Sequence, residues 1–156
     1  MGAGSWVKLR RTYRSSHCPS IWVVEIAASL VYAPAVVERN AHQFAIEIAR
    51  IAHDYKSENL VALDLRGISS VTDFVVICTG TSDRQMRAVA DLVIEYGKKV
   101  GETPYGKAGY DNAVWILLDY VDVVFHTFAK VYREYYDLEL LWGDAPRVDW
   151  VRSESA

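Results

Sequence analysis

Apolar residues recur at spacings of three and four between positions 41 and 55, as they do along the buried face of an amphipathic helix. Asn40 stands directly before this stripe, and an asparagine side chain can accept a hydrogen bond from the first turn of a helix. The pattern therefore predicts a first helix that begins after Asn40. Its apolar stripe comprises Ala41, Phe44, Ala45, Ile48, Ile51, Ala52 and Tyr55.

Four later segments are short apolar runs whose lengths suit strands better than helices. Three of the four are almost continuously apolar, which predicts a sheet covered on both faces. Any uncovered part of a face that carries Trp115 or Phe125 would be an apolar patch for a partner. The predicted strands are residues 60–65, 74–79, 113–119 and 123–128.

The links between these strands carry turn signals. Gly67 and two serines lie between the first two strands, which leaves an antiparallel return open. Only residues 120–122 join the last two strands, and this short link predicts a tight hairpin. Residues 103–112 contain one proline and two glycines and are predicted to form a loop.

Two more helices follow from the same spacing argument. Ser82 and Gln85 form a capping box before an apolar stripe, and Gly101 can end the helix that it starts. A third stripe runs through residues 131–142, and Gly143 can stop that helix.

The order of these elements predicts an α/β fold, an α-β-α sandwich around a mixed four- or five-stranded sheet. We divide the chain into an N-terminal extension, residues 1–35, a domain, residues 36–145, and a polar C-terminal tail, residues 146–156. The tail is expected to fray.

The extension has a basic segment followed by an apolar run that Glu25 interrupts. The chain has no charge-free stretch of about 18 residues, so a transmembrane helix is not expected. We interpret residues 1–35 as an organelle-targeting segment or a misassigned start. The predicted location is the cytoplasm, with an organelle as the alternative.

Composition fits one globular domain, since the 156 residues are 51% hydrophobic and 24% charged. Cys18 and Cys78 are the only cysteines, which excludes a disulfide framework and any metal site built from four cysteines.

Charge is unevenly distributed along the chain, whose formal net charge is −3. Residues 1–35 hold four basic residues and one acidic residue, so residues 36–156 hold 13 basic and 19 acidic residues, a net −6. This excess excludes the broad positive face that non-specific nucleic-acid binding requires. A basic protein is the better predicted partner.

Residues 79–84 (TGTSDR) lie between a predicted strand and a predicted helix, a position where backbone amides can hold a phosphate. The segment has one glycine and no P-loop lysine, and Asp83 would repel an anion. We interpret it as a capped strand-to-helix turn.

Catalytic carboxylates would have to converge in pairs for a two-metal nucleotidyl transfer. Asp64 has Arg66 at the next same-face position, while Asp119 and Asp122 are interpreted as turn residues. His126 lies in an apolar strand with no nucleophile nearby and is interpreted as a core or interface residue. We therefore predict no catalytic residue, no cofactor and no metal site.

The last predicted helix combines aromatic with acidic residues, and the acidic ones disfavour stacking with RNA. We expect Tyr135 and Trp142 to pack on the sheet, which leaves Tyr132 and Tyr136 partly available.

Three sequence blocks match one known family in order and spacing, namely residues 73–87 (DFVVICTGTSDRQMR), 115–124 (WILLDYVDVV) and 133–142 (REYYDLELLW). They resemble the Iojap-like ribosomal silencing factors, over about residues 36–145. The resemblance implies a nucleotidyltransferase-like α/β fold without known catalysis. It also implies binding to the large ribosomal subunit through its protein fourteen, which blocks joining of the small subunit and represses translation when nutrients are scarce.

Two departures from the family pattern matter. The family commonly has Glu-Gly where this chain has Ala108-Gly109, and Gly-Asp where it has Val121-Asp122. A β-branched residue tolerates a left-handed turn poorly, so we expect another turn type or a hairpin one residue longer.

The partner surface is predicted on the third strand and its hairpin, because tryptophan and tyrosine are frequent interface anchors. Tyr120 and Asp122 are expected near the turn, where substitution is tolerated. Three of the residues alternate onto one strand face. The predicted contact residues are Trp115, Leu117, Asp119, Tyr120, Asp122 and His126.

Alternatives remain at this stage. The function could instead be that of a divergent nucleotidyltransferase-like enzyme, and a homodimer is left open. The acidic last helix around Glu134 and Asp137 is the alternative partner surface. Sequence-specific nucleic-acid binding and a membrane partner are not expected.

Overall fold

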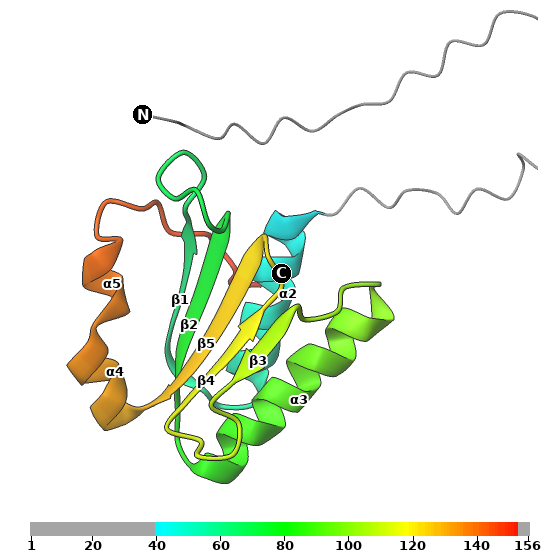
Figure 1. The fold of residues 1–156 in the computed structure, drawn as a ribbon, viewed down its shortest axis with the longest axis vertical. Coiled ribbons are helices and arrows are strands. Elements are labelled where there is room, and N and C mark those ends of the chain that lie inside the picture. Colours follow the sequence, from blue (N-terminus) through cyan, green and yellow to red (C-terminus); the bar gives the residue numbers. More distant parts are fainter. Residues whose placement is uncertain (1–39, 153–156) are drawn as a thin grey trace, which may run out of the picture. The chain divides into compact units, whose positions relative to one another are not determined.

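The computed structural model describes residues 40–152, in which a five-stranded sheet lies between helices (Figure 1). The predicted extension, residues 1–35, lies outside the described residues, so its boundary stays a prediction. In chain order the elements are α2 (Ala41–Asp54), β1 (Glu58–Asp64), β2 (Phe74–Gly80), α3 (Asp83–Lys99), β3 (Gly106–Ala108), β4 (Trp115–Asp119), β5 (Val123–Ala129), α4 (Lys130–Tyr136) and α5 (Leu138–Leu141).

The sheet has the strand order β1-β2-β5-β4-β3. β2 and β5 are parallel, while the other neighbouring pairs are antiparallel. The predicted α/β class around a mixed sheet is thus confirmed, as are the antiparallel return from β1 to β2 and the β4–β5 hairpin. The fifth strand, β3, lies within the segment that we predicted to be a loop. Its three residues include one glycine and are too few to show a strand pattern in the sequence.

Side-chain hydrogen bonds start both long helices, as the sequence predicts. Asn40 Oδ1 accepts from the Gln43 N–H at 3.0 Å, and Ser82 Oγ accepts from the Gln85 N–H at 3.2 Å. The Gln85 side-chain amide also donates to the Tyr55 carbonyl at 2.9 Å. The first turn of α3 is therefore tied to the end of α2.

One face of the sheet packs on α2 and α3, which lie on the same side of it (Figure 1), and forms the main core. Side chains from all the longer strands contribute to this core. Its largest fully buried members are Phe74, Phe125, Ile48, Met86, Ile116 and Leu118.

The opposite face carries a smaller buried cluster, which the chain around α5 covers with Leu138, Trp142 and Ala145. The buried members come from β1, β2 and the end of β5, and none comes from β4. The cover on this face is therefore incomplete. The buried members are Val61, Leu63, Leu65, Val75, Ile77 and Phe128.

The last helix is broken where we predicted one continuous helix over residues 131–142. α4 ends at Tyr136 and α5 begins at Leu138, because Asp137 between them has a left-handed backbone with φ +38°. The predicted packing of Tyr135 on the sheet is wrong, since this side chain is 80% exposed.

The C-terminal segment is docked, not frayed, over residues 146–152. The Val148 N–H donates to the Ala62 carbonyl at 2.8 Å, and the Asp64 N–H donates to the Pro146 carbonyl at 2.9 Å. The predicted fraying is wrong for these residues because β1 is an edge strand, whose outer backbone groups find partners in the tail.

Candidate protein interface

The side chains of β4 alternate between the main core and the incompletely covered face. Ile116 and Leu118 are buried in the core, whereas Trp115, Leu117 and Asp119 point the other way and are half-buried. The predicted alternation of these three residues onto one face is confirmed. Leu117 belongs to neither buried cluster, so its side chain is open to a partner.

β5 adds its own alternate side chains to the same face through its pairing with β4. The register sets Leu117 opposite His126 and Asp119 opposite Val124. We call this surface the open face and define it as Trp115, Leu117, Asp119, Val124 and Tyr136, with the buried His126 beneath it.

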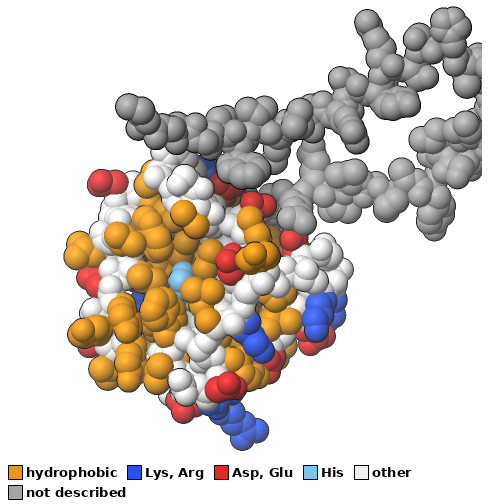
Figure 2. All heavy atoms as spheres, viewed as in Figure 1, with side chains coloured by type: hydrophobic (Ala, Val, Ile, Leu, Met, Phe, Trp, Pro, Cys, Tyr) orange, Lys and Arg blue, Asp and Glu red, His pale blue; other side chains and the backbone are white. Residues whose placement is uncertain are grey.

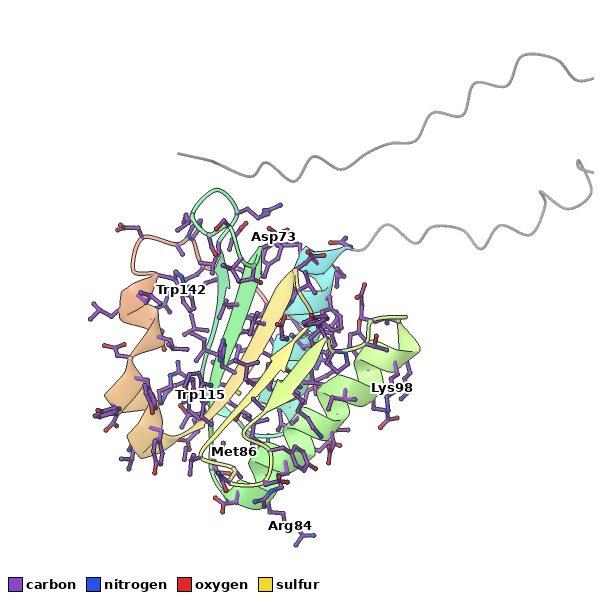
Figure 3. All side chains as sticks on the ribbon, viewed as in Figure 1. Asp73, Arg84, Met86, Lys98, Trp115 and Trp142 are labelled. Carbon is purple, nitrogen blue, oxygen red and sulfur yellow. The ribbon has the colours of Figure 1, made fainter. Side chains whose placement is uncertain are left out.

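Trp115 is the centre of an aromatic cluster at the margin of the open face. Its ring centroid lies 4.9 Å from that of Phe128 and 5.0 Å from that of Tyr136 on α4. Figure 3 shows Trp115 on the side of the sheet toward α4. The indole Nε1–H donates to His126 Nδ1 at 3.1 Å, so both ring position and tilt are fixed.

His126 is a structural histidine beneath the indole, 5% exposed, which agrees with its interpretation as a core or interface residue. Burial lowers the pKa of His126 to about 4, because the low-dielectric interior disfavours the imidazolium. The neutral ring can accept the indole hydrogen bond at Nδ1, whereas protonation of Nδ1 would abolish it.

We expect the free energy of unfolding to fall by about 2 kcal/mol between pH 7 and pH 5 through His126 alone. Its folded pKa is depressed, so the unfolded chain binds more protons between the ordinary value of 6.5 and about 4. The stabilisation is present above pH 6.5 and is lost as the pH falls. Denaturant titrations at both pH values would measure it, and His126→Gln removes this part of the difference. An unchanged difference in the variant would show that other groups cause it.

Tyr120 is not part of the open face. It is 4% exposed, its ring meets Phe44 edge-on at 4.8 Å between centroids, and its hydroxyl donates to the Val93 carbonyl at 3.3 Å. Burial raises the pKa of Tyr120 to about 12. The expectation that Tyr120 tolerates substitution near the turn is wrong, because it continues the core-facing alternation of Ile116 and Leu118.

The β4–β5 turn consists of residues 120–122, with Val121 at φ +73°. The valine itself takes the left-handed conformation, so the expectation that a β-branched residue would avoid it here is wrong. The Val121 N–H donates to Asp119 Oδ1 at 2.7 Å. The half-buried Asp122 accepts from the Asp73 N–H with its carbonyl at 3.0 Å, which attaches the turn to the start of β2.

Acidic side chains border the open face. Asp119 lies at its hairpin end, and Glu134 and Asp137 are exposed, the first on α4 and the second just after it. Figure 2 shows hydrophobic side chains gathered over this side of the molecule, with both acidic and basic ones around the margin. An apolar centre with an acidic border is suited to a basic protein.

Val124 and Tyr136 belong to the open face, although the sequence analysis did not place them in the predicted surface. Val124 lies two positions before His126 on the same strand, so alternation along β5 could have predicted its place on this face. Tyr136 is one of the two tyrosines that the sequence leaves partly available, and α4 places its ring against Trp115.

The residues considered for catalysis have structural roles. The Arg66 guanidinium donates to both oxygens of Asp64, at 2.9 Å and 2.5 Å, and holds the pKa of that carboxyl below its ordinary value. Burial raises the pKa of the Cys78 thiol, which disfavours a reactive thiolate. Among residues 40–152, no three His, Cys, Asp or Glu side chains are placed to hold a metal ion.

Comparison with known families decides the identity. Residues 38–156 match the family described as "Ribosomal silencing factor during starvation". The chain belongs to this family. The resemblance of the three sequence blocks is thereby confirmed for the ribosomal silencing factors.

Named relatives of the ribosomal silencing factor family cover most of the domain. The ribosomal silencing factor RsfS of Bacillus subtilis is 44% identical over 101 residues, which are 65% of this chain and 86% of the relative. RsfS of Halalkalibacterium halodurans is 45% identical over 62% of this chain and 82% of its own length. The chloroplastic protein Iojap of Arabidopsis thaliana is 31% identical over 68% of this chain and 44% of its own length.

Solved structures agree with this family assignment. A crystal structure from Chromobacterium violaceum has a TM-score of 0.60 at 32% identity, over 74% of this chain and 93% of that one. A crystal structure from Bacillus halodurans has a TM-score of 0.57 at 39% identity, over 69% and 94%. No helix between residues 40 and 152 of this chain has the length and apolar character of a membrane span.

Proposed function

We propose that this ribosomal silencing factor binds the large ribosomal subunit through its protein fourteen and blocks joining of the small subunit. It thereby represses translation in cells that are short of nutrients. The observation that carries the proposal is the open face, an apolar sheet surface that the described domain leaves half-covered. Family membership supports the ribosomal role, since the named bacterial relatives are silencing factors.

The contact residues that we propose combine an apolar centre with an acidic border. Leu117 and Val124 supply partly exposed apolar surface, and Trp115 is the anchor that tryptophan commonly provides in interfaces. Asp119 and Asp122 would accept hydrogen bonds from basic side chains of the partner. His126 acts beneath the surface by positioning the indole.

Charge supports a protein partner and disfavours ribosomal RNA. Residues 36–156 carry a net −6, so phosphate groups repel the domain while a basic ribosomal protein attracts it. An interface of about 800 Å² per partner would cover the open face and the hairpin. A second copy of this chain is the alternative occupant.

We infer a regulatory rather than an enzymatic role. Asp64 is engaged by Arg66 and the turn before α3 is held by its own caps, which leaves neither free for nucleotide chemistry. Nucleotide with magnesium is accordingly expected to give no turnover. We place the protein in the cytoplasm, and the organellar Iojap relatives keep an organelle as the alternative.

Purified protein is expected to lower the yield of joined ribosomes when it is added to large subunits before small subunits. The physical reason is steric, because the bound domain occupies surface that the small subunit needs. Sucrose gradients measure the yield. Adding the same protein to small subunits first, and washing it away, provides the control. Full joining at saturating protein would contradict the proposal.

A further inference from the structure

Val121 holds a backbone conformation that costs a valine free energy. Its φ of +73° lies in the left-handed region, and it is the only β-branched residue there among residues 40–152. The branched side chain crowds the neighbouring backbone in that region, whereas glycine adopts it freely. The turn is thus strained at one residue.

Hydrogen bonds around the turn keep Val121 in place. The Asp122 N–H donates to the Tyr120 carbonyl at 2.9 Å, and the Tyr120 N–H donates to the Val123 carbonyl at 2.9 Å. With the bond from the Val121 N–H to Asp119, they over-determine the backbone. Strain of this kind persists only where the surroundings enforce it.

Packing inside the domain does not offset the strain. The Val121 side chain is 50% exposed and belongs to neither buried cluster. Its methyl groups therefore contribute little to the folded domain. Backbone strain that no packing inside the domain offsets indicates that the side chain acts outside the domain, in a complex.

We propose that Val121 is a contact residue of the partner interface, an apolar anchor that the strained turn holds rigidly at the acidic border of the open face. It lies between Asp119 and Asp122, at the end of the strand that supplies three open-face residues. The matching site on the partner is an apolar depression flanked by basic side chains. This inference rests on the proposed function and names a further residue for it.

The first test is Val121→Gly in the full chain, because glycine removes both the strain and the side chain. The melting temperature is expected to rise by about 3–6 °C. The affinity for purified large subunits is expected to fall about three- to tenfold, as for the loss of a buried valine contact. The inference thus predicts a variant that melts at a higher temperature and binds large subunits more weakly.

Two matched variants separate the contact from the stiffness of the turn. Val121→Ala keeps a Cβ that restrains the backbone but lacks the methyl groups, and it is expected to bind as weakly as Val121→Gly. Val121→Ile keeps the branched apolar side chain and is expected to bind within about twofold of wild type.

Three results would overturn the inference. Wild-type affinity in Val121→Gly would show that the Val121 side chain makes no contact with the partner. Wild-type affinity in Val121→Ala alone would show that the stiffness of the turn causes the effect. An unchanged melting temperature in Val121→Gly would show that the turn is not strained. Each leaves the proposed function intact. Wild-type protein that fails to bind large subunits would overturn both.

Discussion

Leu117→Lys is expected to weaken binding to the large subunit by about 100-fold or more while the domain stays folded. Leu117 lies at the centre of the open face and outside both buried clusters, so a lysine stem can keep its place with the ammonium in water. In the complex the same charge would be desolvated against a basic partner, which costs several kcal/mol. Equilibrium binding to purified large subunits measures the loss.

Val100→Lys is the matched control for this substitution. Val100 is 43% exposed and caps α3, on the opposite side of the sheet from the open face. The control is expected to bind as wild type and to melt within about 2 °C of it. If Leu117→Lys also bound as wild type, the open face would not be the ribosomal interface. If it abolished only self-association, the occupant would be a second copy.

Gly109→Ala is expected to destabilise the domain by about 3 kcal/mol or more. A Cβ at this position would lie 1.8 Å from the Trp115 carbonyl oxygen, and Gly109 also has φ +73°. The clash falls on the backbone of β4, which cannot give way without disturbing the open face. Left-handed strain and overpacking each cost about 1–3 kcal/mol. Denaturant unfolding of the variant measures the sum.

Gly101→Ala isolates the clash from the strain. Gly101 has φ +82°, but a Cβ there would meet nothing within 4 Å. This variant is expected to lose only about 1 kcal/mol, from the left-handed conformation alone. Equal losses in the two variants would show that the loop carrying Gly109 moves away from β4 and that no clash exists.

Much of the fold was predictable because its signals are local. The caps at Asn40 and Ser82, the apolar stripes of α2 and α3 and the alternation of β4 each involve a few neighbouring residues, and these appear in the structure. The elements that failed depend on distant partners. β3 exists only because β4 pairs with it, and the tail is ordered by the free edge of β1 together with the burial of Val148 in the main core.

The candidate site was predictable on one strand and not at its end. Alternation places Trp115 and Leu117 correctly, but it cannot tell which face the helices cover. Tyr120 shows the limit, because its aromatic ring suits an interface and a core equally, and only the three-dimensional packing assigns it to the core. Tyr136 joins the open face because α4 follows β5 directly and sets the Tyr136 ring 5.0 Å from that of Trp115, a contact between distant residues that periodicity does not indicate.

Photo-crosslinking from position 117 tests the central claim most directly. A benzophenone side chain replaces Leu117 in the full chain, the protein is bound to purified large subunits, and the crosslinked partner is identified by mass spectrometry. The same side chain at position 100, on α3, serves as the control. The account predicts that position 117 crosslinks to ribosomal protein fourteen and that position 100 does not. Crosslinking of position 117 to ribosomal RNA or to another ribosomal protein would contradict it.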